Sequence, residues 1–317
     1  MMRSMTADIR DEILVFDRAA VRAHRERSAL LPRADRFLRD EVQARLVDRL
    51  NDVKPRFERA LDLGGGDGGL APLLAEAGRD MQIVTLEPAG RFAARLPGAV
   101  IGEEEALPFA AGSFDLVVST LGLHWTNDLP GALWQICRVL RPDGLMLAAL
   151  FGGETLWELR EALTLAELEV ASGAAPRVSP FADLRDAGGL LQRAGFALPV
   201  VDGELLTVTY PDAFALMREL RALGETNALR HRTRGLTRRA VLFRAAEIYR
   251  DRFGDASGRI PASFQLITLT GWAPAEGQPR PLKPGSASKR LAEALGSIEH
   301  KAGEAARPGP LAAKRLS

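Results

Sequence analysis

Several features that would place a protein in a special class are missing from this chain of 317 residues. It has a single cysteine, Cys137, so it can form neither an internal disulfide nor a cysteine-rich metal site. Cys137 lies among apolar residues at helical spacing, which favours a core thiol over a nucleophile. The formal net charge is only +1, so the overall charge does not point to nucleic acid or to a membrane surface.

Long apolar runs are also missing. No stretch approaches the roughly 18 apolar residues of a membrane-spanning helix, so we expect no membrane insertion. Residues 1–18 contain acids early and lack the layout of a secretory signal or transit peptide, which favours a cytoplasmic protein. Hydrophobic residues make up 46% of the chain and charged residues 26%, a composition typical of a soluble globular protein with a sizeable core.

The most informative segment is ALDLGGGDGGL at residues 60–70. A short apolar run is followed by five glycines and then by apolar residues at helical spacing over residues 70–77. Glycines permit positive φ angles and close approach of a ligand, and the first amides of a helix are unpaired donors. We therefore predict a buried strand, a sharp turn and a helix, with a polar ligand site at the carboxyl end of the strand. The glycines also fit the bare dinucleotide pattern G-x-G-x-x-G.

Two further acidic positions accompany predicted strands. Residues 82–87 form an apolar, partly β-branched run that ends in Glu87. A carboxylate there can accept hydrogen bonds from both hydroxyls of a ribose, although it could also be a solvated acid at a strand end. Residues 102–119, GEEEALPFAAGSFDLVVS, place Glu103 before a turn and a strand at residues 114–119.

These three segments, in this order, resemble class I S-adenosyl-L-methionine (SAM) methyltransferases, whose first motif D-L-G-x-G-x-G is matched at residues 62–68. The resemblance implies that the glycine loop cradles the amino-acid end of SAM and that the acid after the second strand binds the ribose. It also implies that the first acid of residues 103–105 meets the adenine amino group and that the end of the fourth strand faces the methyl donor. The implied cofactor-binding residues are Asp62, Gly64, Gly66, Gly68, Glu87, Glu103 and Ser119.

The expected fold is α/β and Rossmann-like, a mostly parallel seven-stranded sheet with helices on both faces, because strand and helix alternate along the chain. We expect one domain over residues 13–273, after a disordered start at residues 1–12 and before a flexible tail at residues 274–317. The predicted strands are residues 59–63, 82–87, 99–102, 114–119, 145–150, 196–201, 204–210 and 264–272. The predicted helices are residues 70–77, 90–95, 129–140, 154–171, 183–194, 212–223 and 237–253, with a short one at 288–295. The helices at 212–223 and 237–253 form a helical insertion at residues 212–255, and R-P-D-G at residues 141–144 predicts a turn.

Residues 13–50 predict two further helices, separated at Pro32, that are rich in arginine. One interpretation is a solvated helix pair that covers one face of the sheet. The other is a basic face that meets an acidic partner protein.

His124 follows the fourth predicted strand and could act as a general base, because an imidazole titrates near neutrality. It could equally pack beside Trp125 over the cofactor pocket. Three acids, Asp128, Glu154 and Glu225, could hold a guanidinium by paired hydrogen bonds, or could be solvated or capping residues. We take His124 and Glu154 as the candidate catalytic residues.

Segments outside the cofactor motifs carry a more specific resemblance. They are F-D-R at residues 16–18, S-T-L-G-L-H-W-T-N-D-L-P at 119–130, F-G-G-E-T-L-W-E-L-R at 151–160, S-P-F at 179–181 and G-E-T-N at 224–227. With them, residues 13–273 resemble the mitochondrial complex I assembly factors of methyltransferase fold. This resemblance implies an enzyme that hydroxylates an arginine of a respiratory complex I subunit, which would be its protein partner. The chain resembles the malonyl-acyl-carrier-protein methyltransferases of biotin synthesis more distantly.

Three functions are open from the sequence. The first is a SAM-dependent enzyme that modifies a complex I arginine. The second is an O-methyltransferase acting on malonyl-acyl-carrier protein or another small carboxylate, with the basic helices docking the acidic carrier. The third is a non-enzymatic assembly chaperone that keeps SAM as a structural ligand. We predict no metal site, since the four histidines show no spacing typical of an iron site. We expect no nucleic-acid partner, and contact with the inner membrane only through the partner protein.

Overall fold

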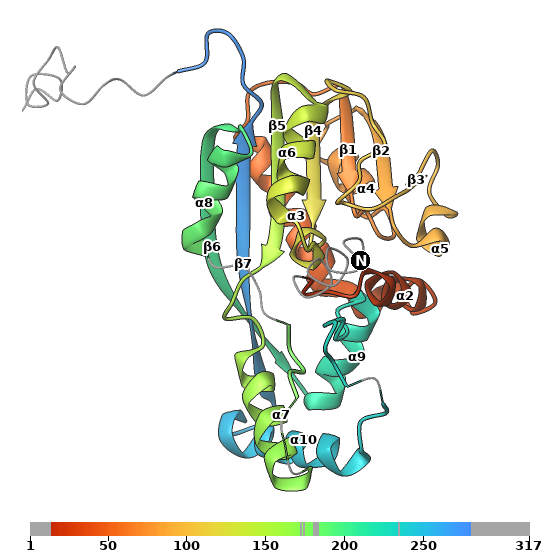
Figure 1. Ribbon diagram of the computed structural model, residues 1–317, viewed down its shortest axis with the longest axis vertical. Helices are drawn as coiled ribbons and strands as arrows, with labels where there is room; N and C mark the ends of the chain where they lie inside the picture. The colour runs from red at the N-terminus through yellow and green to blue at the C-terminus, as the bar shows by residue number, and fades with distance from the viewer. Residues whose placement is uncertain (1–13, 172, 174, 180–183, 234, 280–317) are drawn as a thin grey trace, which may run out of the picture. The chain divides into compact units, whose positions relative to one another are not determined.

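The computed structural model describes residues 14–171, 173, 175–179, 184–233 and 235–279. In this part of the chain seven strands form one sheet in the order β3-β2-β1-β4-β5-β7-β6 (Figure 1). The first five strands pair in parallel, and β7 runs antiparallel to both β5 and β6. This is the Rossmann-like α/β fold expected from the alternation of strand and helix.

The strands follow the apolar runs of the sequence, because each central strand is buried on both faces of the sheet. Their bounds are β1 (Arg59–Leu63), β2 (Gln82–Glu87), β3 (Val100–Ile101), β4 (Phe114–Thr120), β5 (Leu140–Phe151), β6 (Ala197–Tyr210) and β7 (Ile260–Trp272).

The α-helices are α2 (Arg18–Ser28), α3 (Phe37–Asn51), α4 (Leu70–Glu76), α5 (Gly90–Ala93), α6 (Leu129–Val139), α7 (Trp157–Val170), α8 (Leu184–Arg193), α9 (Ala213–Leu223) and α10 (Arg239–Phe253). The 3₁₀ helices of the described residues are η1 (Arg33–Arg36) and η2 (Leu123–Trp125). No helix among the described residues is both long enough and apolar enough to cross a membrane.

The expected turn at residues 141–144 is wrong as a boundary between α6 and β5. α6 ends at Val139, and β5 begins at once with Leu140. The pairing with β4 then shifts from Phe114 opposite Leu140 to Leu116 opposite Leu145. Asp143 adopts a positive φ of 59° inside this irregular stretch, so R-P-D-G forms a bulge within β5.

The two segments expected at residues 196–201 and 204–210 form one strand, β6. The intervening Asp202 and Gly203 stay paired with Thr268 and Ile267 of β7. Their polar and glycine character suggested an interruption, but β6 is the edge strand, where such residues are tolerated. The helix expected at residues 154–171 begins at Trp157, after Leu156 with a positive φ of 56°.

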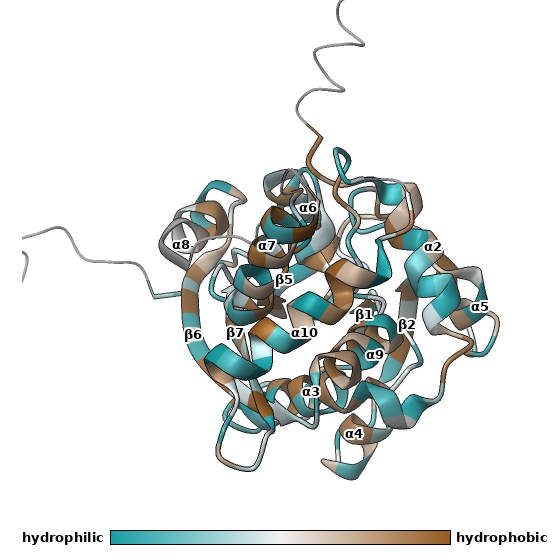
Figure 2. Ribbon diagram, turned by 90° about the horizontal axis from the view of Figure 1, so that it is seen from below, coloured by the Kyte–Doolittle hydropathy of each residue, from teal (hydrophilic) through white to brown (hydrophobic). Residues whose placement is uncertain are grey.

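Two helices that are far apart in the sequence, α2 and α9, cover the carboxyl ends of β1 and β2. α2 and α9 lie there in both views (Figures 1 and 2), and α3 follows α2 after the break at Pro32. A buried stripe on α3 anchors this helix against the sheet: Leu38, Val42, Leu46 and Leu50.

The domain boundary expected at residues 273–274 lies close to a division of the chain into residues 1–276 and 277–317. The expectations for residues 1–12 and for a helix at residues 288–295 fall outside the described residues.

Candidate functional site

The loop after β1 has the backbone that the glycines predicted. Gly64, Gly66 and Gly68 have φ angles of +73°, +60° and +78°, which other residues rarely adopt. The Gly64 amide donates to the Leu86 carbonyl at 2.8 Å, which ties the loop to the end of β2. The loop therefore makes a tight, buried turn at the carboxyl end of β1.

Asp62 lies under this loop and is 1% exposed. Burial raises the pKa of its carboxyl to about 7, although the Arg39 guanidinium lowers it. Its Oδ1 has no hydrogen-bond partner, while a Cβ at Gly65 would lie only 2.5 Å from Oδ2. The buried Asp62 can therefore accept a further hydrogen bond at Oδ1.

Glu87, at the end of β2, is completely buried. Its Oε1 accepts from the Ala89 amide at 2.9 Å, and its Oε2 accepts from the Gly66 amide at 2.8 Å. The Arg25 guanidinium binds both oxygens, with Nε donating to Oε1 at 2.9 Å. Burial alone would raise the pKa of Glu87, but Arg25 and the two amides hold it below its ordinary value.

The acidic residues 103–105 also bind arginines of α2. Glu103 accepts from Arg18 Nε at 3.2 Å and pairs with Arg22, while the buried Glu104 pairs with Arg18. Burial would raise the pKa of Glu103, but hydrogen bonds from Arg22 and the nearby Arg18 lower it.

A further arginine, Arg39 of α3, reaches the glycine loop. Its Nη2 donates to the Gly64 carbonyl at 2.5 Å, and the same carbonyl accepts from Arg25 at 3.0 Å. A Cβ built at Gly66 would lie 3.1 Å from the Arg39 Cζ. Arg25 and Arg39 are 4% and 5% exposed, so their interpretation as part of a solvated face is wrong.

Sequence reasoning missed that these arginines meet the candidate cofactor acids. One signal was present, because residues 18, 22 and 25 share one face of a helix by their spacing. Ser119 also lies at this end of the sheet, where its hydroxyl donates to the Leu63 carbonyl at 3.0 Å and links β4 to β1.

His124 and Trp125 lie in η2, directly after β4. His124 Nε2 is 3.0 Å from Glu225 Oε2, and Trp125 Nε1 donates to Glu225 Oε1 at 3.2 Å. The Phe151 ring centroid lies 5.1 Å from that of His124. Residues from η2, β5 and the loop after α9 thus form a compact group of one carboxylate and three rings.

A small cavity adjoins this group. Apolar side chains make up most of its lining, and Glu225 is its acidic residue. The residues around it are Trp125, Phe151, Thr155, Leu156, Leu159, Leu163, Arg177, Val178, Ser179, Leu220, Glu225 and Asn227.

Of the three acids proposed to hold a guanidinium, only Glu225 borders the cavity. Asp128 caps α6, since its Oδ1 accepts from the Gly131 amide at 2.8 Å. Glu154 is exposed and does not line the cavity. The candidate catalytic residues His124 and Glu154 therefore lie in different surroundings.

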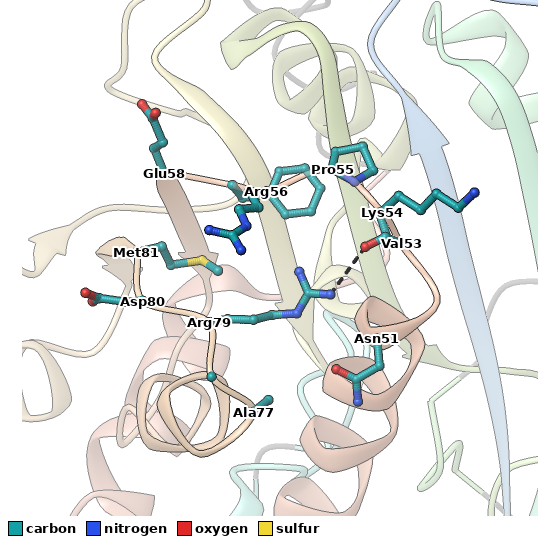
Figure 3. Close-up of a pocket in the computed structure, with 12 residues that line it drawn as sticks. Asn51, Val53, Lys54, Pro55, Arg56, Glu58, Ala77, Arg79, Asp80 and Met81 are labelled. Atoms are coloured by element: carbon teal, nitrogen blue, oxygen red, sulfur yellow. Dashed lines mark hydrogen bonds between the residues drawn. The ribbon is translucent and has the colours of Figure 1, made fainter.

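A second hollow lies at the opposite end of β1 and β2, where these strands begin (Figure 3). Arg79 points into it and donates to the Val53 carbonyl at 3.4 Å. Its cations and acids are mixed: Lys54, Arg56, Arg79, Glu58 and Asp80. It is remote from the glycine loop, at the other end of the sheet.

The residues at the carboxyl end of the sheet fit SAM as a ligand. Gly66 has a positive φ and leaves no room for a Cβ beside Arg39, and Asp62 Oδ1 is a buried acceptor without a partner. Glu87 and Glu103 have the charge that ribose hydroxyls and an adenine amino group require. No group of three or more metal-binding side chains occurs among the described residues.

The fold and this site define a class I methyltransferase-fold enzyme. Residues 61–148 match the family described as "Methyltransferase domain". A solved Bacillus halodurans structure assigned to the methyltransferases aligns with a TM-score of 0.50 at 15% identity, covering 73% of this chain and 99% of that one. At this identity the likeness concerns the fold alone.

Comparison with related sequences gives a more specific match. "Arginine-hydroxylase NDUFAF5, mitochondrial" from Homo sapiens is 41% identical over 90% of this chain and 84% of its own length. The protein of the same name from Danio rerio is 40% identical, over 88% and 89%. A "Malonyl-[acyl-carrier protein] O-methyltransferase" from Laribacter hongkongensis is 36% identical, over 86% and 95%. The chain belongs to this family of SAM-dependent methyltransferase-fold enzymes, as its motifs implied.

Proposed function

We propose that this chain binds SAM at the carboxyl end of β1 and β2 and modifies an arginine side chain of a partner protein, a subunit of respiratory complex I. The cofactor-binding residues in this proposal are Asp62, Gly64, Gly66, Gly68, Glu87, Glu103 and Ser119. When bound, SAM supplies an electrophilic methyl group.

The observation that carries the proposal is the carboxylate of Glu225 at the edge of an aromatic and apolar cavity. A guanidinium is planar, stacks on aromatic rings and forms strong hydrogen bonds to a carboxylate. Trp125 and Phe151 offer the rings, and Glu225 offers the charge. Arg177 also lines the cavity. Its Nε donates to Glu167 at 2.7 Å and its Nη1 to the Thr237 hydroxyl at 2.7 Å, so this cation already has partners in the protein. Glu225 therefore favours a cationic substrate.

His124 is suited to positioning the carboxylate of Glu225. Its side chain is buried, and its Nε2 faces Glu225. A carboxylate only accepts hydrogen bonds, so His124 Nε2 donates to Glu225 and holds its carboxylate in place for an arginine that enters beside it. The apolar walls of the cavity exclude water from the reacting groups.

Carboxyl methylation of malonyl-acyl-carrier protein is the second candidate, supported by the relatives of that name at 36% and 37% identity. A malonyl carboxylate requires a cation in the cavity. Arg177 is the cavity's arginine, and its contacts to Glu167 and Thr237 argue against that use. The arginine substrate is the better match to the charges present.

The relatives named arginine-hydroxylase are described as mitochondrial. They do not support the cytoplasmic location expected from the sequence. We propose that the protein works beside the inner membrane, to which its complex I partner attaches it.

Mass spectrometry of complex I arginine peptides tests this function. Peptides from cells with the gene, without it, and with Glu225→Gln should differ at one arginine. A gain of one oxygen that requires the gene and Glu225 would establish hydroxylation, and a gain of one methylene would establish methylation. No change at any arginine, together with a biotin requirement on loss of the gene, would establish the carrier-protein substrate instead. Intact assembly by an inactive variant would favour the chaperone.

A further inference from the structure

Three arginines of α2 bind the acids that the proposed function assigns to SAM. We call Arg18, Arg22 and Arg25 the α2 arginine cluster. Arg25 binds both oxygens of Glu87, Arg22 binds Glu103, and Arg18 binds Glu103 and Glu104. The α2 arginine cluster thus contacts both the proposed ribose-binding acid, Glu87, and the proposed adenine-binding acid, Glu103.

The hydrogen-bonding capacity of Glu87 is already used. A carboxylate has about four acceptor positions. Two accept the Gly66 and Ala89 amides, and two accept the Nε and Nη2 groups of Arg25. Both amides belong to the backbone of the site and stay in place. The two hydroxyls of a ribose can therefore bind Glu87 only in exchange for Arg25.

Arg25 is enclosed and has little freedom to turn aside. Its side chain is 5% exposed, and its Cγ lies 3.3 Å from the position that a Cβ on Gly224 would take. Its Nη2 also donates to the Gly64 carbonyl at 3.0 Å. The guanidinium can therefore leave Glu87 only when α2, which carries Arg25, shifts relative to Gly64 and Gly224.

We propose that α2 competes with SAM within the same molecule, so that cofactor binding requires Arg25 to leave Glu87 and α2 to shift. The proposal rests on the proposed function, because it assumes that Glu87 is the ribose acid. Glu225 connects this movement with the substrate cavity, since it follows Gly224 directly and lies near enough to Arg25 to interact with its charge. A partner that displaces α2 would therefore promote SAM binding.

Isothermal titration of purified full-length protein with SAM tests the competition. Arg25→Met removes the charge and keeps much of the side-chain volume. If the Arg25-bound state is about 90% populated or more, removing it tightens the apparent affinity about tenfold or more. The matched control is Arg27→Met, because Arg27 is an exposed residue of the same helix. Its affinity for SAM should equal that of the unsubstituted protein.

The outcomes separate the competition between α2 and SAM from the assignment of SAM as the cofactor. Tighter SAM binding by Arg25→Met alone supports the competition. Unchanged or weaker binding overturns the competition and leaves SAM use intact. If neither protein binds SAM, the cofactor assignment fails and the competition fails with it.

Arg25→Met leaves a buried carboxylate without its cation and could fail to fold. Hydrogen exchange of the unsubstituted protein provides a second test. Saturating SAM should accelerate amide exchange within residues 18–28, because α2 loses its contacts to Glu87, Glu103 and Glu104. Slower or unchanged exchange there would overturn the proposal.

Discussion

His124 and Glu225 are 101 residues apart in the chain, yet His124 Nε2 lies 3.0 Å from Glu225 Oε2. Trp125 Nε1 donates to the other carboxylate oxygen at 3.2 Å. These two contacts fix the plane of the carboxylate at the cavity edge. The loop after α9 and η2 are joined in this way at the proposed substrate site.

Glu225→Gln should reduce turnover of an arginine peptide by about tenfold or more while SAM affinity stays unchanged. The substitution keeps the shape but removes the charge, and a hydrogen bond to a charged group contributes about 1.5–3 kcal/mol. Steady-state kinetics and SAM titration of the same protein measure both quantities. The control is Glu247→Gln, at an exposed acid on α10 that pairs with Arg244. Full activity of Glu225→Gln would refute the role proposed for this carboxylate.

Glu87→Gln should weaken SAM binding at least about tenfold, because it removes the charge that the ribose hydroxyls would meet. It should also destabilise the free protein by about 3–5 kcal/mol, since the buried Arg25 loses its counter-charge. Titration with SAM and urea unfolding measure the two effects. Glu76→Gln, at an exposed position of α4, is the matched control. Equal SAM affinity in all three proteins would remove Glu87 from the cofactor site.

Gly65→Ala should destabilise the protein by roughly 1–3 kcal/mol through overpacking. An added Cβ would lie 2.4 Å from Thr85 Cγ2 and 2.5 Å from Asp62 Oδ2, so β2 or the loop must move. Gly153→Ala is the control, because no atom lies within 4 Å of a Cβ at that position. Urea unfolding compares the two variants. A Gly65→Ala protein as stable as Gly153→Ala would mean that the loop after β1 adapts at little cost.

Asp62 should make the folded protein less stable as the pH rises from about 4 to about 7. Burial raises its folded-state pKa to about 7 from an ordinary 3.8, so the folded chain holds a proton that the unfolded chain releases in this range. The full effect is at most about 4 kcal/mol at 1.36 kcal/mol per pKa unit.

The comparison of Asp62→Asn with the unsubstituted protein isolates this contribution. Asparagine cannot ionise, so its advantage in unfolding free energy should be larger at pH 8 than at pH 5. Urea unfolding at the two pH values gives the difference. The same advantage at both values would show that Asp62 is ionised throughout.

The sequence by itself determined the fold class and the glycine loop. β1 and β2 have the predicted bounds of residues 59–63 and 82–87, because short, nearly continuous apolar runs are typical of strands buried on both faces of a parallel sheet. The positive φ angles of Gly64, Gly66 and Gly68 follow from the same local chemistry. The helices at residues 212–223 and 237–253 were predictable because their apolar periodicity is local.

Only the tertiary structure decided which charges meet. Arg25 and Glu87 are 62 positions apart. Helical spacing places Arg25 on one face with Arg18 and Arg22, but it does not show that this face meets Glu87. The selection of Glu225 over Glu154 has the same origin, since both are acids after a helix or strand. Ion pairs and cavities are formed by elements that are distant in the sequence. The energy of an ion pair depends on its burial, which the amino-acid sequence does not specify locally.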